Sequence, residues 1–334
     1  MEILVKKNKP KKSIVLDTYW KFACERQNVF FNKMINNHQI LTNDEILKKH
    51  KFTNAFRASD RVSQYLIRNV IYRQKDQNES DLLLKILLFK IFNKIETWEL
   101  LISEFGDISS SSFNFNEINS VLLEAMKLKE SIYSGAYIMA SGKSIFGFER
   151  KHENHLKLLE EKIINERLIE KVKSSNSMEE LFRILLDLPT VGSFLAYQFA
   201  IDINYSELVN FSEMDFVVPG PGAKDGIRKC FTDLGDFNET DIIKYVTDIQ
   251  EDEFIRLELN FKNLWGRRLQ LIDCQNLFCE TDKYSRVAHP EISGISNRKR
   301  IKQIYKPKTT EIRLFYPPKW NINHIVDLSL KTEG

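Results

Sequence analysis

The chain has 334 residues, of which 43% are hydrophobic and 28% are charged, and its formal net charge is +3. This composition is typical of a folded globular protein and excludes extensive disorder. No apolar run approaches the roughly 18 residues that a membrane-spanning helix requires, and the N-terminus lacks the apolar core of a signal peptide. We therefore expect a soluble, cytoplasmic protein that does not bind membranes.

The four cysteines form no CxxC pair, and their spacing suits neither a zinc site nor an iron-sulfur cluster. They are Cys24, Cys230, Cys274 and Cys279. We therefore expect no metal site and no required cofactor.

Basic residues concentrate in two runs beside prolines, KKNKPKK at 6–12 and RKRIKQIYKPK at 298–308. Such runs can neutralise nucleic-acid phosphates or can simply be solvated tails. Arg298, Lys299 and Arg300 are our candidates for phosphate contacts. We expect a basic leader over residues 1–15, a helical region over 16–308 and a C-terminal tail over 309–334.

Apolar periodicity predicts mostly helices. The expected ranges are 16–35, 62–72, 81–92, 97–105, 116–129, 149–173, 179–186 and 239–261. An N-cap pattern at 42–45 predicts a short helix ending at Lys49. Strand signals are few, so the sequence predicts an all-α protein.

Two polar segments could line a pocket. The first is the connection 52–61, where Asn54, Arg57 and Asp60 could line the pocket. Alternatively, Arg57, Asp60 and Arg61 could form a surface ion network. The second follows residue 267, where Gln275 and Asp282 fall at spacings that place them on one helix face. Residues 141–144 (SGKS) end like a phosphate-binding P-loop, but Tyr137 replaces its first glycine, the preceding residues look helical and no strand leads in, so we reject a P-loop.

Two turns in the stretch 186–231 can bring unpaired backbone N–H groups close to an anion. The first is a hairpin at 188–192 between two helices, and the second is the turn 219–222 that opens another helix. The candidate phosphate-binding residues in these turns are Thr190, Val191, Gly192, Ser193, Gly220, Gly222 and Lys224.

A hairpin that holds a DNA backbone, followed by an acid, suits an enzyme that attacks a flipped-out nucleotide. Asp215 is the leading candidate for the catalytic carboxylate. Asp225 is an alternate that could instead complement a helix dipole, and Glu213 and Asp202 are weaker candidates.

Four segments in order resemble one family: FTNAFRASDRVSQYL (52–66), LPTVGSFLAYQF (188–199), GPGAKDGIRKCF (220–231) and LFCETDKYSR (277–286). The chain resembles, over most of its length, the α-glutamyl/putrescinyl thymine pyrophosphorylases, a family also known as the helical domain of 5-hydroxymethyl-deoxyuridine DNA kinases. The family resembles helix-hairpin-helix DNA glycosylases and is associated with hypermodified phage DNA. Thr190 stands where glycosylases have the first hairpin glycine.

The resemblance implies a helix-hairpin-helix, DNA-glycosylase-like helical fold, with a hairpin lobe at about 114–237. It implies a glycosylase that excises a bulky modified pyrimidine from double-stranded phage DNA in anti-phage defence. Because the sequence has no obvious lysine beside Asp215, we expect a monofunctional reaction with water as the nucleophile. A monovalent cation at the hairpin is left open. The pocket or backbone-contact residues would be Asn54, Arg57, Asp60, Gln275, Glu280, Asp282 and Lys283.

Two other functions remain open. One is a nucleotide-dependent kinase or pyrophosphorylase that acts on a hydroxymethylpyrimidine in DNA, as the family's names suggest. The other is a non-catalytic DNA-binding module in which the acids are structural.

Overall fold

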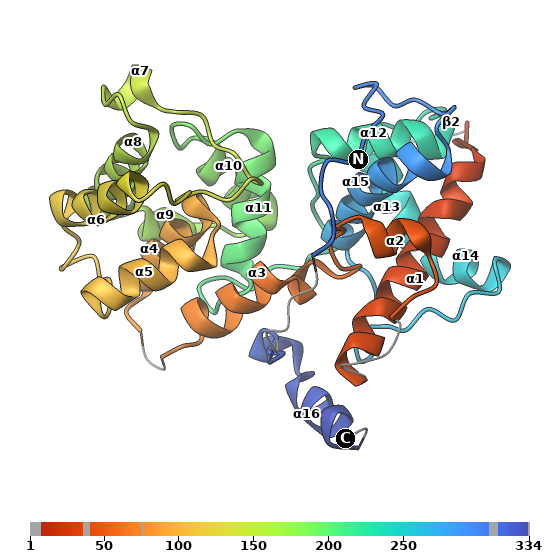
Figure 1. Cartoon of the computed structure of the whole chain (residues 1–334), viewed down its shortest axis with the longest axis horizontal. Coiled ribbons are helices and arrows are strands. Elements are labelled where there is room, and N and C mark those ends of the chain that lie inside the picture. Colours follow the sequence, from red (N-terminus) through yellow and green to blue (C-terminus); the bar gives the residue numbers. More distant parts are fainter. Residues whose placement is uncertain (1–7, 36–40, 75–76, 307–312, 333–334) are drawn as a thin grey trace. The chain divides into compact units, whose positions relative to one another are not determined.

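The computed structural model describes residues 8–35, 41–74, 77–306 and 313–332, and these residues fold mostly into helices (Figure 1). The prediction of an all-α protein is therefore confirmed. The chain divides into two compact units. Unit 1 takes its described residues from 1–60, 213–314 and 318–334, and unit 2 consists of 61–212 and 315–317. The lobe expected at about 114–237 coincides with neither unit, because its residues divide between the two after Ser212.

Unit 1 combines the beginning of the chain with its last third. Its helices are α1 (Ile14–Ile35), α2 (Glu45–Lys49), η1 (Arg57–Ser59), α12 (Pro221–Cys230), α13 (Glu239–Asp248), α14 (Gln250–Arg256), α15 (Leu271–Ala288), η4 (Pro318–Trp320) and α16 (Asn323–Thr332). Strands β1 (Lys11–Lys12) and β2 (Phe231–Asp233) pair antiparallel, with Lys12 opposite Phe231. Part of the expected basic leader is thus a short strand, and residues 1–7 lie outside the described residues.

The core of unit 1 is built around α15. Tyr19 of α1 is fully buried, and its ring lies 4.7 Å from that of Phe278 on α15. Helix α12 packs closely against the same helix. A Cβ added at Gly226 would lie only 2.0 Å from the Phe278 carbonyl oxygen, which shows how little space separates the two helices. A Cβ at Gly222 would lie 2.3 Å from Cys279 Sγ. The glycines of α12 therefore set how α15 is placed.

Unit 2 holds the middle of the chain. Its helices are α3 (Arg61–Tyr65), η2 (Leu66–Ile71), α4 (Glu79–Phe92), α5 (Ile95–Phe105), α6 (Phe115–Lys127), α7 (Lys143–Phe146), α8 (Lys151–Leu158), η3 (Leu159–Asn165), α9 (Leu168–Ser174), α10 (Met178–Leu186) and α11 (Ser193–Asn204). Helices η2 and η3 are π-helical. Every residue of α4 from Leu82 to Phe92 is buried, so α4 is the central helix of this unit. Among the described residues, no helix is both long and apolar enough to span a membrane.

Several predicted elements differ in the structure. The single helix expected over 149–173 is wrong, because Arg167 has a left-handed backbone (φ 48°) that interrupts it between η3 and α9. The helix expected over 239–261 divides at Ile249 and ends at Arg256. The residues before Ser141 were expected to be helical, but 130–142 contain no helix. In the tail, residues 309–312, 333 and 334 lie outside the described residues, and 313–332 contain the helices η4 and α16.

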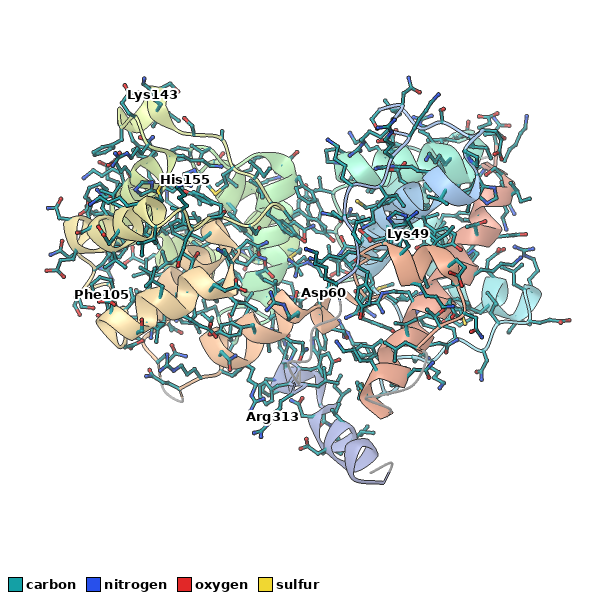
Figure 2. The ribbon with its side chains drawn as sticks, in the orientation of Figure 1. Lys49, Asp60, Phe105, Lys143, His155 and Arg313 are labelled. Atoms are coloured by element: carbon teal, nitrogen blue, oxygen red, sulfur yellow. The ribbon has the colours of Figure 1, made fainter. Side chains whose placement is uncertain are left out.

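His155 of α8 is fully buried in unit 2 and joins two parts of the preceding loop (Figure 2). Its Nε2 lies 2.8 Å from the Ala140 carbonyl oxygen, and its Nδ1 lies 2.8 Å from the Tyr133 hydroxyl. A carbonyl oxygen can only accept, so Nε2 carries the hydrogen and Nδ1 accepts from Tyr133. Burial lowers the pKa of His155 to about 4, and the side chain is neutral at pH 7.

We expect protonation of His155 to destabilise unit 2. Its pKa in the folded protein lies below the ordinary value of about 6.5, so its stabilisation is complete above pH 6.5 and is lost as the pH falls toward about 4. The difference in the free energy of unfolding amounts to about 3 kcal/mol. Denaturant titrations of the parent and His155→Gln at several pH values would measure it. A parent whose pH dependence in this range equals that of the variant would contradict the assignment.

Candidate functional site

The connection after α2 is held against α15 by two carboxylates. Glu280 accepts a hydrogen bond from the backbone N–H of Thr53 (3.1 Å), and Asp273 accepts one from the backbone N–H of Arg57 (2.8 Å). Glu280 and Asp273 are two turns apart on one helix face. Burial raises the pKa of Asp273 to about 7, against its hydrogen bonds from Gln270 and Arg57. The structure therefore brings together two of the segments that the sequence indicated for a pocket.

Asp60 closes this connection at the end of η1 (Figure 2). Its Oδ1 accepts a hydrogen bond from the backbone N–H of Asn54 (2.7 Å), and the Asn54 amide donates to the Ser59 carbonyl oxygen (2.7 Å). Burial raises the pKa of Asp60 to about 6, although the Asn54 hydrogen bond and the charge of Arg26 oppose the shift. A carboxylate with this pKa can accept a proton near neutral pH.

Lys283 lies one turn after Glu280 on α15. Its Nζ is 2.7 Å from Glu280 Oε2 and 4.5 Å from the centre of the Phe52 ring. The Lys283 cation therefore sits between an acid of α15 and an aromatic residue of the connection, next to Thr53.

Arg26, which the sequence motifs did not indicate, lies on α1 one turn beyond Phe22. The Phe22 ring lies 5.3 Å from the rings of both Phe52 and Tyr284. Residues four apart share a helix face, so Arg26 faces the connection and α15. Burial lowers the pKa of Arg26, while Asp60 and Glu280 oppose that shift. We call Arg26, Thr53, Asp60, Glu280 and Lys283 the polar centre.

Asp282 and Gln275 are not part of the polar centre. Asp282 is buried on another face of α15, where it pairs with Lys229 of α12 (3.0 Å) and with Arg286 (2.5 Å). Gln275 is also buried. Arg57 contributes its backbone N–H, and its side chain is buried in unit 1. The contacts of Asp282 are those of a structural ion pair between two helices.

Hydrogen bonds hold the basic run near residue 300 against other parts of unit 1. Asp225 of α12 accepts hydrogen bonds from the Ser296 backbone N–H (2.7 Å) and from Arg298 (2.8 Å). Burial alone would raise the pKa of Asp225, but these bonds outweigh it and hold the pKa below its ordinary value. Further along, the Lys51 N–H donates to Gln303, and the Tyr305 N–H donates to Lys49. We call residues 298–306 the basic strap, in which Lys299 and Arg300 are exposed.

The acids proposed for catalysis differ in their surroundings. Asp215 is exposed in a turn of unit 1. Glu213 is buried and pairs with Arg267 (2.9 Å). Asp202 belongs to unit 2 and pairs with buried Lys90 (3.2 Å). The paired acids are held by cations, which leaves Asp215 as the solvent-facing member of the set.

The residues of the predicted hairpin form the turn between α10 and α11 in unit 2. Thr190 has a left-handed backbone (φ 69°), which β-branched residues rarely adopt, and its buried hydroxyl has no hydrogen-bond partner among the described residues. The Val191 N–H donates to Leu188, and Gly192 caps α11 with open space around its Cα. Ser193 is exposed at the start of α11. These backbone groups can contact an anion, and their role in DNA binding stays a prediction.

The second turn differs from this hairpin. Gly220 caps α12 and is buried, whereas Lys224 is exposed. A side chain at Gly222 would collide with Cys279, so close packing of α12 against α15 accounts for a glycine at this position.

The SGKS segment starts the short helix α7. Lys143 pairs with Glu149 (2.6 Å), and a Cβ at Gly142 would lie 2.9 Å from the Thr190 methyl group. Within the described ranges, strands occur only at 11–12 and 231–233, so no strand leads directly into this segment.

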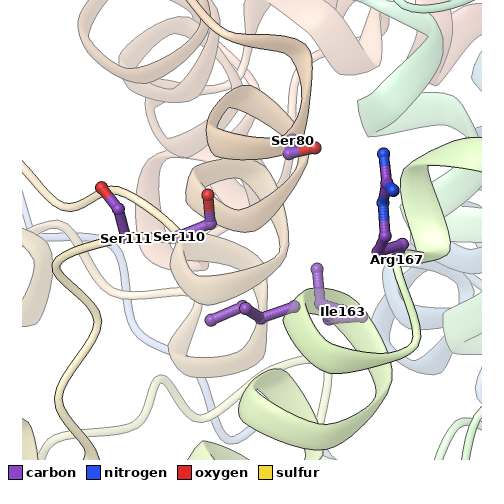
Figure 3. Close-up of a pocket in the computed structure, with 6 residues that line it drawn as sticks. Ser80, Ser110, Ser111, Ile163 and Arg167 are labelled. Atoms are coloured by element: carbon purple, nitrogen blue, oxygen red, sulfur yellow. The ribbon is translucent and has the colours of Figure 1, made fainter.

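A separate hollow of about 280 Å³ lies at the start of α4 in unit 2 (Figure 3). The lining residues are Ser80, Ser110, Ser111, Ile163, Ile164 and Arg167. Its Ser110 hydroxyl donates to Asp81 (2.6 Å), and none of the residues predicted for a site lines it. The part of the chain that the structure describes contains no group of three His, Cys, Asp or Glu residues that could hold a metal ion.

Comparisons with known proteins name a kinase. The sequence model of a family described as "5-hmdU DNA kinase, helical domain" matches residues 13–294. The "5-hmdU DNA kinase" of Bacillus phage SP10 is 28% identical to the chain over 288 residues, which cover 80% of this chain and 44% of the phage protein. The chain thus spans less than half of that relative. No solved structure matches the chain.

These findings correct the function expected from the sequence. Both name a kinase, which transfers a phosphoryl group, so the expectation of a DNA glycosylase that hydrolyses N-glycosidic bonds is wrong. Asp215 was expected to act in that reaction, so this expected role no longer applies. The kinase alternative agrees with both matches, and the match covers most of the chain. The chain belongs to the family of 5-hmdU DNA kinase helical domains.

Proposed function

We propose that this protein binds DNA that contains 5-hydroxymethyl-deoxyuridine (5-hmdU) and phosphorylates the hydroxymethyl group of that base. The observation that carries the proposal is the family match over residues 13–294, which includes the whole polar centre. The relative from phage SP10 carries the same description. Double-stranded DNA from a phage remains the expected form of the substrate.

In this proposal Asp60 is the proton acceptor. The hydroxymethyl oxygen attacks the γ-phosphorus of a nucleoside triphosphate, the O–H proton passes to the Asp60 carboxylate, and the bond to the leaving nucleoside diphosphate breaks. Asp60 suits this step because its pKa is raised to about 6 and because one of its oxygens, Oδ1, is already fixed by Asn54. The donor nucleotide would bind outside the SGKS segment, which starts the four-residue helix α7 and pairs its lysine with Glu149.

Each unit offers groups that could contact the DNA backbone. In unit 2 these are the N–H groups around Gly192 and Ser193. In unit 1 they are the side chains of the basic strap, where Lys299, Arg300 and Lys302 are exposed and the described residues 298–306 contain no acid. Such contacts give affinity that falls with salt and that does not depend on sequence.

We expect the protein to bind a 5-hmdU oligonucleotide about tenfold more tightly than the same oligonucleotide with thymidine, because one hydrogen bond from the hydroxyl to a charged group is worth about 1.5–3 kcal/mol. Fluorescence anisotropy with both oligonucleotides, single-stranded and as duplexes, would measure the ratio. Equal affinity for the two bases in both forms would count against recognition of the hydroxymethyl group. Binding with a preference but without phosphoryl transfer would favour the non-catalytic DNA-binding alternative.

A further inference from the structure

Arg26 has a buried hydrogen-bond donor that no other residue of the polar centre satisfies, as expected of an arginine that binds an anion. Its Nη1 is buried and has no hydrogen-bond partner among the described residues. A guanidinium stays charged in proteins, and a buried donor without a partner costs free energy. Such an atom in a folded protein calls for an explanation, and an absent ligand is one.

A second unpaired group lies on the connection that contacts α15. The Thr53 hydroxyl is buried and has no partner in the described part of the chain. The Thr53 backbone N–H donates to Glu280 Oε2, and Lys283 Nζ lies 2.7 Å from the same oxygen. Arg26 approaches from α1, because Phe22 one turn earlier packs against Phe52, the neighbour of Thr53. Thr53 contacts Glu280, and the charge of Glu280 also acts on Arg26, so both unpaired groups belong to the surroundings of Glu280.

The acids near Arg26 already have other partners. Asp60, Glu280 and Tyr305 are the groups that oppose the pKa shift of Arg26. Glu280 is already neutralised by Lys283, and Asp60 Oδ1 accepts the Asn54 N–H. The basic strap passes beside the end of α2, since the Tyr305 N–H donates to the carbonyl oxygen of Lys49 (3.0 Å; Lys49 is labelled in Figure 2). Arg26 thus lies near two acids that have other partners and near Tyr305 of the basic strap.

We propose that Arg26 and the Thr53 hydroxyl form a phosphate subsite in unit 1. This inference rests on the proposed function for its ligand, which is either the phosphate monoester on a phosphorylated base or a phosphodiester of the DNA backbone. The planar guanidinium can donate two parallel hydrogen bonds to phosphate oxygens, and a threonine hydroxyl can donate a third. A subsite of this kind would hold the transferred phosphoryl group beside Asp60.

Three oligonucleotides distinguish the two sources of phosphate. They carry thymidine, 5-hmdU or 5-phosphomethyl-deoxyuridine at one position. If the subsite takes the monoester, Arg26→Gln weakens binding of the phosphorylated oligonucleotide about tenfold or more and leaves the other two unchanged. If it takes a backbone phosphodiester, the variant weakens all three equally. Lys21→Gln, which removes an exposed cation from the same helix, is the matched control, and Arg26→Lys should recover part of the binding.

The inference is overturned if Arg26→Gln binds all three oligonucleotides as tightly as Lys21→Gln does. A measurement on the unmodified protein guards against misfolding of the variant: inorganic phosphate should shift the Nε–Hε resonance of Arg26 in NMR spectra, and an unchanged resonance counts against the subsite. Failure of the proposed function looks different. In that case the parent protein binds thymidine and 5-hmdU oligonucleotides equally, whatever Arg26 does.

Discussion

Asp60→Asn should reduce phosphoryl transfer to 5-hmdU DNA by about 100-fold or more, because a positioned general base contributes roughly 10²- to 10⁴-fold to a rate. Asparagine can still accept the Asn54 N–H but cannot take a proton. DNA binding should therefore change little. The rate can be followed as label transferred from γ-labelled ATP.

The pH profile adds a second readout. The parent rate should rise with pH through about 6, because Asp60 must be deprotonated to act and its pKa is raised to about 6. Asp60→Asn should lose this rise. Asp252→Asn, which changes an exposed acid on α14, is the matched control and should keep both rate and profile. Transfer by Asp60→Asn at the parent rate would remove Asp60 from the mechanism.

Asp282→Ala should lower the free energy of unfolding by about 3–5 kcal/mol, the cost of removing one partner from a buried ion pair. The substitution leaves two cations, Lys229 and Arg286, without their carboxylate, and the side chains of Lys229 and Asp282 are only 2% and 3% exposed. Chemical denaturation would measure the loss.

Two further variants show whether the loss comes from unpaired charge. The double variant Lys229→Met/Asp282→Leu should lose less stability than Asp282→Ala, because it removes both charges of the pair. Asp252→Ala should stay within about 0.5 kcal/mol of the parent, as most surface substitutions do. An Asp282→Ala protein that unfolds like the parent but binds 5-hmdU DNA poorly would return Asp282 to the substrate site.

Local sequence signals predicted local structure well. The pattern at 42–45 predicted an N-cap, and the Asp44 side chain accepts hydrogen bonds from the N–H groups of Ile46 and Leu47. The turn before α11 was equally visible. Unusual backbone conformations were not visible in the sequence. The left-handed backbone of Arg167 ends a helix that the apolar periodicity of 149–173 would continue, and nothing in the composition of that segment distinguishes Arg167.

The candidate site depended on contacts between distant parts of the chain. The motifs at 52–66 and 277–286 contain two segments that meet in the structure, where Thr53 contacts Glu280. Within those segments, the sequence could not distinguish Glu280 and Lys283, which face the connection, from Asp282, which faces α12. Arg26 was missed because its only signal is its position one turn after Phe22. The sequence made Asp225 an alternate catalytic acid because it could not show that Ser296 and Arg298, much later in the chain, donate hydrogen bonds to this carboxylate.

The central claim is that this protein phosphorylates the hydroxymethyl group of 5-hmdU in DNA. Mass spectrometry of nucleosides tests it most directly, after 5-hmdU DNA has been incubated with the protein, ATP and Mg²⁺. We predict that a nucleoside one phosphate heavier than 5-hmdU appears, that it requires both ATP and the protein, and that thymidine DNA yields none. A 5-hmdU nucleoside that keeps its mass under these conditions would contradict the claim.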